Sequence, residues 1–127
     1  MKMHAKAKGQ PRKMKDNLKP VFNPASVALI GASRDRKSVG HGILENLLKG
    51  CVFENPYCSP FSGRVYAVNP KAGKIMGVKC HKSVKSIRGR IDLAIIAVPS
   101  GAVKQVVEEC VQKGVGGIII ISAGFAE

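Results

Sequence analysis

The sequence predicts a single α/β domain in which helices flank a parallel β-sheet. Apolar runs of strand length alternate along the chain with segments whose apolar residues recur at helical spacing. The runs are continuously apolar, which is typical of parallel strands that are buried on both faces. The 127 residues suffice for one core of ordinary size and for no second one. This alternation of strand and helix predicts right-handed crossover connections.

The first strand and the first helix of this domain follow each other closely. The strand is expected over residues 26–30, where an apolar run ends at Gly31. The helix is expected over residues 38–49, because Ser38 is a favourable N-cap and Gly50 is a favourable C-terminal stop. Its apolar residues form one stripe, which consists of Ile43, Leu44, Leu47 and Leu48.

Two further strands are expected in the middle of the chain. The first covers residues 64–68 and ends at an Asn-Pro pair. The stretch that follows is expected to consist of turns, with one helical turn near residues 83–87. Residues 92–98 form the clearest buried strand of the sequence, and Pro99 stops it.

The last helix and the last strand complete the predicted sheet. Residues 100–113 are expected to form a helix that Ser100 caps and Gly114 closes. Residues 117–122 are expected to form the last strand. The helical residues expected to face the core are Val103, Val106, Val107, Cys110 and Val111.

The net charge of +13 is the unusual feature of the composition. Residues 1–20 carry seven cations and one anion, with few apolar side chains, so we expect a disordered basic arm ahead of a domain over residues 21–127. The alternative for this arm is nonspecific binding to nucleic acid or another acidic polymer. The arm lacks the apolar stretch of a secretory signal, and no run of about 18 apolar residues occurs. We therefore expect a cytoplasmic protein with no membrane contact.

The four cysteines do not form a recognisable metal or redox motif, because no C-x-x-C and no zinc-type spacing occurs. We expect four reduced thiols, with Cys110 a small core residue on its helix. A disulfide between Cys51 and Cys58 across one loop is the alternative. No metal site is predicted.

Small and polar loops follow the predicted strands. The carboxyl ends of parallel strands meet at one edge of a sheet, where the ligands of such folds bind. We expect a binding site there, because four loops converge on that edge: Gly31, Ala32 and Ser33; Asn69, Pro70 and Lys71; Val98, Pro99 and Ser100; and Ser122, Ala123 and Gly124.

The first of these loops has features of a phosphate site. It enters a helix directly, and a helix start offers free backbone N–H groups and a positive dipole end. Gly40 and Gly42 in the first helical turn would let a phosphate approach the backbone, so we expect Gly40→Val to weaken ligand binding without disturbing the fold. A helix start that merely carries glycines is the alternative, since the spacing is not G-x-G-x-x-G.

The second loop discriminates between nucleotide ligands. An NAD site requires a carboxylate at the end of the second strand, whereas this strand is followed by Lys71. A lysine there favours a ribose that carries an extra phosphate, as in coenzyme A or NADP. An ordinary surface lysine is the alternative.

No catalytic constellation is evident, since neither His41 nor His81 has a nucleophile or carboxylate at triad spacing. The chain also lacks a GKS/T phosphate loop, which argues against ATP hydrolysis. Only four Phe and two Tyr are present, so the aromatic residues of single-strand nucleic-acid binders are missing. We expect no nucleic-acid partner and assign no catalytic residue.

In order and spacing, several segments resemble the coenzyme A-binding domain of NDP-forming acyl-CoA synthetases, the family of ADP-forming acetate–CoA ligases and the succinyl-CoA synthetase alpha subunit. The resemblance covers roughly residues 18–127. Each motif is weak alone, and the ordered set is specific. The segments are FNPASVALIGAS at 22–33, SVG at 38–40, VYAVNPK at 65–71, DLA at 92–94 with VP at 98–99, and IISAGFAE at 120–127.

The resemblance implies a Rossmann-like domain that holds coenzyme A. Carried over residue by residue, Lys71 would contact the phosphorylated ribose, with Lys74 as a substitute in another loop register. The phosphates would be surrounded by Gly31, Ala32, Ser33, Ser38 and Gly40. The adenine or pantetheine side would be lined by Val98, Pro99 and Ser100, and the path of the pantetheine thiol by Ser122, Ala123 and Gly124.

The resemblance also implies an activity that these residues do not complete. The family interconverts acyl-CoA, ADP and phosphate with acid, CoA and ATP, through a phosphorylated histidine on a following domain and through ATP-grasp segments. Neither part occurs in the sequence. We therefore expect a CoA-binding module, with CoA or acyl-CoA and the remaining domains or subunit of an acyl-CoA synthetase as partners. A stand-alone CoA-binding regulatory protein and an NADP-binding module are the alternatives.

Overall fold

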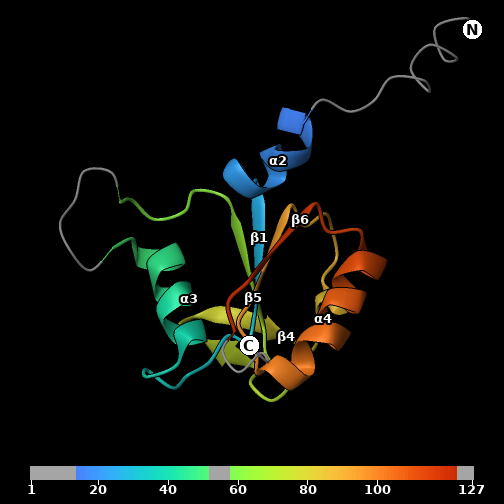
Figure 1. Cartoon of the computed structure of the whole chain (residues 1–127). Helices are drawn as coiled ribbons and strands as arrows, with labels where there is room; N and C mark the ends of the chain where they lie inside the picture. Colours follow the sequence, from blue (N-terminus) through green and yellow to red (C-terminus); the bar gives the residue numbers. More distant parts are fainter. Residues whose placement is uncertain (1–13, 52–57, 123–127) are drawn as a thin grey trace, which may run out of the picture.

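The computed structural model describes residues 14–51 and 58–122, which form a six-stranded sheet with helices on both faces (Figure 1). The strands follow the order β3-β4-β2-β1-β5-β6 and are parallel except for the β3–β4 pair. Their bounds are β1 Ser26–Ile30, β2 Arg64–Val68, β3 Lys74–Ile75, β4 Val78–His81, β5 Leu93–Ile96 and β6 Gly117–Ile120. The helices are α2 Met14–Phe22, α3 Val39–Lys49, the 3-10 turn η1 Val84–Ser86 and α4 Ser100–Lys113. The predicted α/β, Rossmann-like fold is confirmed.

Strand β1 lies at the centre of the parallel sheet, between β2 and β5. All five of its residues are buried, which explains why its sequence is continuously apolar after Ser26. In the register of the sheet, Leu29 lies beside Ala67 on β2 and beside Ile95 on β5. The strands that lie next to β1 therefore leave the sheet at the same edge, which we call the carboxyl edge; the opposite edge is the amino edge.

Two separate apolar cores cover the two faces of the sheet, because successive strand residues point to opposite sides. The face under α4 and η1 buries Ala28, Ile30, Val68, Val84, Ile87, Ile91, Ala94, Ile96, Val103 and Cys110. The face under α3 buries Leu29, Ala32, Leu44, Ala67, Ile75 and Cys80. The expected core position of Cys110 is confirmed, since its side chain is fully buried.

The helix ends agree with the sequence in most respects. The Ser38 side chain caps α3 by accepting from the backbone N–H of His41 at 3.1 Å, and Gly114 closes α4 in the left-handed conformation. The predicted cap of α4 is wrong: Ser100 is the first helical residue, and the preceding N-cap, Pro99, makes no side-chain cap bond. Val111 was expected in the core but is 68% exposed, because it lies off the stripe defined by Val103 and Cys110.

The antiparallel hairpin of β3 and β4 lies where the sequence indicated only turns. Met76 and Gly77 form its two-residue turn, and both have positive φ, at 48° and 79°. Such a turn favours Asn or Gly at its first position, so a methionine there conceals it in the sequence.

Helix α2 covers Met14–Phe22, so residues 14–20 of the predicted arm are helical. This helix lies at the amino edge, where Pro20 and Val21 approach Gly116 and Gly117 at the start of β6. The absence of side chains at these two glycines allows the close approach, which no local pattern in the arm indicates. Residues 1–13 of the predicted arm lie outside the described residues.

A disulfide joins Cys51 to Cys58, whose Cα atoms are 5.4 Å apart, so the expectation of four reduced thiols is wrong. The chain after α3 doubles back on its C-cap: the backbone of Cys58 lies against Gly50, and the Phe61 N–H donates to the Leu47 carbonyl at 2.9 Å. This reversal brings together two cysteines that are seven positions apart. Cys80 and Cys110 are free and buried.

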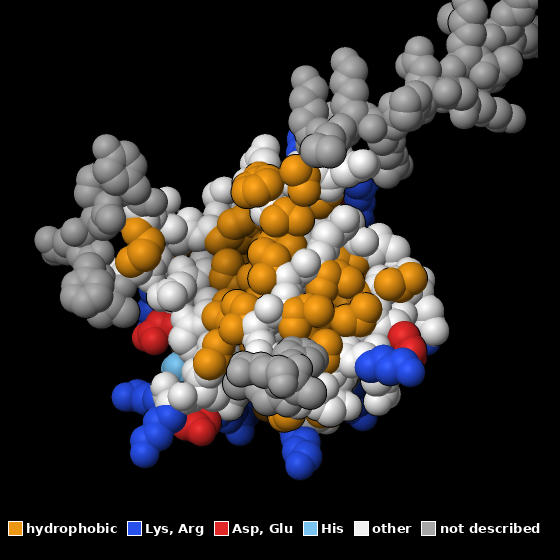
Figure 2. Space-filling model, viewed as in Figure 1, with side chains coloured by type: hydrophobic (Ala, Val, Ile, Leu, Met, Phe, Trp, Pro, Cys, Tyr) orange, Lys and Arg blue, Asp and Glu red, His pale blue; other side chains and the backbone are white. Residues whose placement is uncertain are grey.

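Strand β6 forms one edge of the sheet and carries apolar side chains in solvent. Ile119, Ile120 and Ile121 are 36–46% exposed. Figure 2 shows hydrophobic side chains gathered on the face between α3 and α4, where this edge lies. None of the described helices has the length and apolar character of a membrane span.

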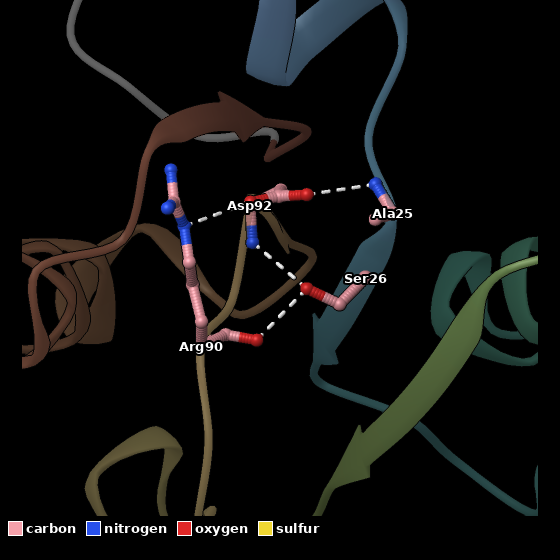
Figure 3. Close-up of polar contacts among 4 residues, drawn as sticks. All are labelled: Ala25, Ser26, Arg90 and Asp92. Carbon is pink, nitrogen blue, oxygen red and sulfur yellow. Dashed lines mark hydrogen bonds and ion pairs between the residues drawn. The ribbon is translucent and has the colours of Figure 1, made fainter.

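Polar contacts fasten the starts of β1 and β5 to each other at the amino edge (Figure 3). The buried Ser26 hydroxyl donates to the Arg90 carbonyl at 2.9 Å and accepts from the Asp92 N–H at 3.0 Å. The Asp92 carboxylate accepts from the Ala25 N–H at 2.7 Å and pairs with the Arg90 guanidinium at 3.2 Å. The one buried polar residue of the described core is thus fully bonded.

We predict that Ser26→Ala lowers the free energy of unfolding by about 1–3 kcal/mol, because it removes a buried hydroxyl that bonds two partly buried backbone groups, the Arg90 carbonyl and the Asp92 N–H. Urea denaturation of the variant and the parent chain measures the change. Ser62→Ala, at an exposed position, serves as the control and should leave stability within about 0.5 kcal/mol. Equal stability of the two variants would contradict the role given to Ser26.

The disulfide and the two buried thiols lead to a prediction about the reactivity of the cysteines. Burial raises the pKa of Cys80, and burial together with Glu109 raises that of Cys110 to about 11. Their thiolate fractions at pH 8 are therefore below that of a free cysteine, and reactivity should rise with pH. We expect a thiol reagent at pH 8 to label the native chain slowly and the unfolded, unreduced chain at two sites. Reduction before unfolding should give four, and four sites without reduction would contradict the disulfide.

Candidate functional site

The loops that leave the strands at the carboxyl edge are held side by side by backbone hydrogen bonds beyond the strand ends. The Gly31 N–H donates to the Val68 carbonyl at 3.2 Å, and the Ala97 N–H donates to the Ile30 carbonyl at 2.8 Å. The Ile121 N–H donates to the Ile96 carbonyl at 2.8 Å. The predicted convergence of these loops is therefore present in the structure.

A cavity of about 320 Å³ opens at this edge, between the ends of β1, β2 and β4 and the first turns of α4. Its apolar wall includes Ile30, Val68, Val98 and Val106. Five of the predicted site residues line it, namely Gly31, Ala32, Asn69, Pro70 and Val98. Six residues that were not predicted for the site also line it, namely Lys82, Ser83, Ala102, Gln105, Val106 and Glu109.

A larger cavity, of about 570 Å³, lies at the amino edge between α2 and the Arg90–Asp92 contacts. The carboxylate in this cavity, that of Asp92, is already bonded to the Ala25 N–H and the Arg90 guanidinium, and these contacts hold β1 and β5 together. We therefore assign the ligand site to the smaller cavity, whose residues follow the strand ends where parallel sheets bind ligands.

The loop between β1 and α3 is ordered by its own polar side chains. The Ser33 hydroxyl accepts from the Asp35 N–H at 3.0 Å, and the Ser38 hydroxyl donates to the Asp35 carbonyl at 2.7 Å. A ring nitrogen of His41 bonds the Ser33 carbonyl at 2.9 Å. Ser33 and Ser38 thus shape the loop, and His41 supports it from the helix.

The glycines of this loop have different roles from those expected. A Cβ atom on the buried Gly40 would collide with the carbonyl of Gly31, and a Cβ on Gly31 would collide with the carbonyl of Ala97. Gly42 faces open space. Gly40 therefore makes room for protein backbone, so the expectation that Gly40→Val leaves the fold intact is wrong.

Asn69 connects the first two loops. Its side-chain N–H donates to the Ala32 carbonyl at 2.8 Å, and its Oδ1 accepts from the N–H groups of Lys71 and Ala72 at 2.8 and 3.0 Å. The side chain of Asn69 is therefore used within the protein. It places Pro70 on the cavity wall.

Lys71 is exposed and lies beside the cavity-lining Pro70 without lining the cavity itself. Lys74 is exposed on β3, and its carbonyl accepts from the Arg34 guanidinium at 2.9 and 3.2 Å. The lysine that lines the cavity is Lys82, which follows β4. The sequence could not indicate it, because β4 itself was not predicted.

The third and fourth loops meet through Ser122, whose hydroxyl donates to the Val98 carbonyl at 2.8 Å. Val98 is half-buried on the cavity wall, Pro99 is exposed, and Ser100 begins α4. The predicted residues Ala123 and Gly124 lie outside the described residues.

Positive charge dominates the loops of the carboxyl edge. Asp35 is the one carboxylate of residues 31–40 and 69–74, against Arg34, Arg36, Lys37, Lys71 and Lys74. His81 at the end of β4 adds no charge at neutral pH, because burial and the nearby Lys79 lower its pKa. Such an edge suits a ligand with several negative charges.

Comparison with known proteins identifies relatives that match most of this chain. The CoA binding domain family model matches residues 25–127. Acetate–CoA ligase (ADP-forming) of Methanocaldococcus jannaschii is 46% identical over 110 residues, which are 87% of this chain and 14% of that protein. The alpha subunit of acetate–CoA ligase (ADP-forming) II of Pyrococcus furiosus is 46% identical over 106 residues, or 84% of this chain and 21% of that subunit.

Solved structures agree. The dinucleotide forming acetyl-coenzyme A synthetase 1 of Candidatus Korarchaeum cryptofilum, in complex with phosphate and ADP, superposes with a TM-score of 0.74 at 39% identity, over 85% of this chain and 21% of that one. A conserved hypothetical protein from Pyrococcus furiosus has a TM-score of 0.63 at 29% identity, over 76% of this chain and 73% of that one. The chain thus spans a small part of its ligase relatives.

The different surroundings of Gly40 and Gly42 give a prediction. We expect Gly40→Ala to lower the free energy of unfolding by about 1–3 kcal/mol, because the new methyl group forces backbone apart. Gly42→Ala is the matched control and should raise stability by about 0.5–1 kcal/mol, since alanine favours the helix. Urea denaturation without ligand measures both. Equal stabilities would show that Gly40 is not held against Gly31.

Proposed function

This chain belongs to the CoA binding domain family, and we propose that it binds coenzyme A across the carboxyl edge of its sheet as the CoA-binding part of an ADP-forming acid–CoA ligase. The observation that supports this most directly is the apolar cavity at that edge, which opens beside a glycine-containing loop and a group of cations. Coenzyme A has matching parts: a flat base, a phosphorylated ribose, a diphosphate and a long neutral arm.

Each part of the ligand has a counterpart among the described residues. The base fits the apolar wall of Ile30, Val68, Val98 and Val106. The diphosphate is held by the loop of Gly31, Ala32 and Ser33 and by the start of α3 at Ser38 and Gly40, where backbone N–H groups and the helix dipole favour an anion. The pantetheine arm passes Pro99, Ser100 and Ser122, and runs on toward Ala123 and Gly124.

The 3′-phosphate of the ribose is assigned to Lys71. Asn69 fixes the backbone of this lysine at the end of β2, and Pro70 beside it lines the cavity. The side chain is exposed, so it reaches the phosphate without a burial cost. Lys82 approaches the cavity from the neighbouring strand end, and Lys74 takes the place of Lys71 in another loop register.

The complete ligase reaction converts an acid, CoA and ATP to acyl-CoA, ADP and phosphate. The chain spans 14% of the ADP-forming acetate–CoA ligase of Methanocaldococcus jannaschii and 21% of the ligase alpha subunit of Pyrococcus furiosus. We assign the CoA-binding step to this chain and the remaining steps to other domains or subunits of such a ligase. No residue of this chain is assigned a role in bond making or breaking.

A second candidate function is a single-domain CoA-binding protein that regulates another enzyme. The observation that favours it is the Pyrococcus furiosus hypothetical protein, since the matched region covers 73% of that chain. The nucleotide sequence downstream of the codon for Glu127 separates the candidates. Codons for further ligase domains would favour the first, and a stop codon would favour the second.

Calorimetric titration of the chain tests the proposed ligand. We expect CoA to bind about tenfold more tightly than dephospho-CoA, which lacks the 3′-phosphate, and more tightly than NADP. Lys71→Met should bring the affinities for CoA and dephospho-CoA close together. Lys49→Met is the control, because Lys49 ends α3 away from the cavity.

Two outcomes would contradict the proposed ligand, and a third would contradict only the role of Lys71. A parent chain that does not bind CoA contradicts the ligand itself. Tighter binding of NADP than of CoA favours a nicotinamide dinucleotide. Equal binding of CoA and dephospho-CoA by the parent chain removes the role of Lys71 alone.

A further inference from the structure

We propose that Glu109 selects the adenine base of coenzyme A by accepting a hydrogen bond from its 6-amino group. This inference rests on the proposed function, because it assigns the base to the cavity at the carboxyl edge. It goes further by naming a specificity-determining residue on α4, a helix in which no functional residue was predicted beyond its first position.

The polar side chains that line the cavity fall into two groups. Asn69 and Ser83 are engaged by the protein: Asn69 bonds Ala32, Lys71 and Ala72, and the Ser83 hydroxyl accepts from the Lys85 N–H at 3.0 Å. Lys82, Gln105 and Glu109 have no hydrogen bond or ion pair within the described residues. A polar group that lines an apolar cavity without a protein partner is available to a ligand.

Helical spacing places the relevant residues of α4 on one side of the cavity. Ala102, Gln105, Val106 and Glu109 all line it, and each lies three or four positions from another member of the set, which is the spacing of one helix face. Val106 contributes to the apolar wall, and Glu109 is half-buried one turn further along the helix. A flat base that packs against Val98 and Val106 therefore lies beside Glu109, which lines the same cavity three positions after Val106.

The chemistry of Glu109 suits an amino group. An ionised carboxylate only accepts hydrogen bonds, and the 6-amino group of adenine only donates them. A hydrogen bond to a charged acceptor is stronger than one between neutral groups, most of all where water is partly excluded. A base without this donor would leave the carboxylate unpaired against the ligand, so binding should favour adenine.

The test compares CoA with an analogue whose base is purine, which lacks the 6-amino group and introduces no new donor. We expect the parent chain to bind CoA about tenfold more tightly than the analogue in calorimetric titrations. In Glu109→Met the ratio should fall close to one. Glu109→Gln keeps an acceptor oxygen without the charge and should give an intermediate ratio.

Glu108→Met is the matched control, because Glu108 is exposed, precedes Glu109 on the same helix and does not line the cavity. It should keep the parent ratio. Circular dichroism and thermal unfolding without ligand establish that all three variants are folded. The use of an affinity ratio for one folded variant removes any general loss of affinity from the comparison.

The outcomes separate this inference from the proposed function. CoA binding with an unchanged ratio in Glu109→Met overturns the role of Glu109 and leaves the proposed function standing. A ratio that falls equally in Glu108→Met also overturns it, because the effect would then be one of charge alone. A parent chain that binds neither CoA nor the analogue overturns both.

Discussion

The close contact of backbone at Gly31 and Gly40 is the constraint on which the carboxyl edge depends. A side chain at either glycine would collide with a neighbouring carbonyl, of Ala97 in one case and of Gly31 in the other. The first turn of α3 therefore sits directly against the exit of β1, and β1 sits against the exit of β5. This packing sets the start of a helix, an apolar cavity and several cations within the same small region.

The polar groups at the two ends of the strands have different roles. Those at the amino edge stabilise the fold, and those at the carboxyl edge form the proposed binding site. At the amino edge, the polar groups of Ser26, Arg90 and Asp92 are bonded to one another and to backbone, which fastens the central strands. At the carboxyl edge, Lys82, Gln105 and Glu109 line the cavity without partners among the described residues. The amino-edge cluster is therefore fully bonded within the protein, whereas the carboxyl edge combines bonded side chains such as Asn69 with side chains that have no partner among the described residues.

The sequence predicted those elements that can be recognised from the pattern of residues within one continuous segment. Strand β1 and helix α4 were predicted over the residues observed, because β1 is a continuous apolar run, α4 has apolar residues at helical spacing, and a glycine follows each. The β3–β4 hairpin, the Cys51–Cys58 bond and the docking of α2 on β6 were not, since each depends on contacts between segments or on an unusual turn residue. The same reason applies to the site. Loop residues after predicted strands were found, whereas Lys82 follows an unpredicted strand and Glu109 reaches the cavity through the packing of α4.

The two outermost strands of the sheet, β3 and β6, differ in their capacity to pair with a strand of another polypeptide. Strand β3 is two residues long and turns back on β4, so it offers little backbone for another strand to join. Strand β6 offers four residues and exposed isoleucines, the properties by which separate polypeptides associate edge to edge. A strand of another polypeptide would therefore extend the sheet at β6 and not at β3. The net charge of +13 makes identical copies of the chain repel each other, whereas an acidic partner would not be repelled.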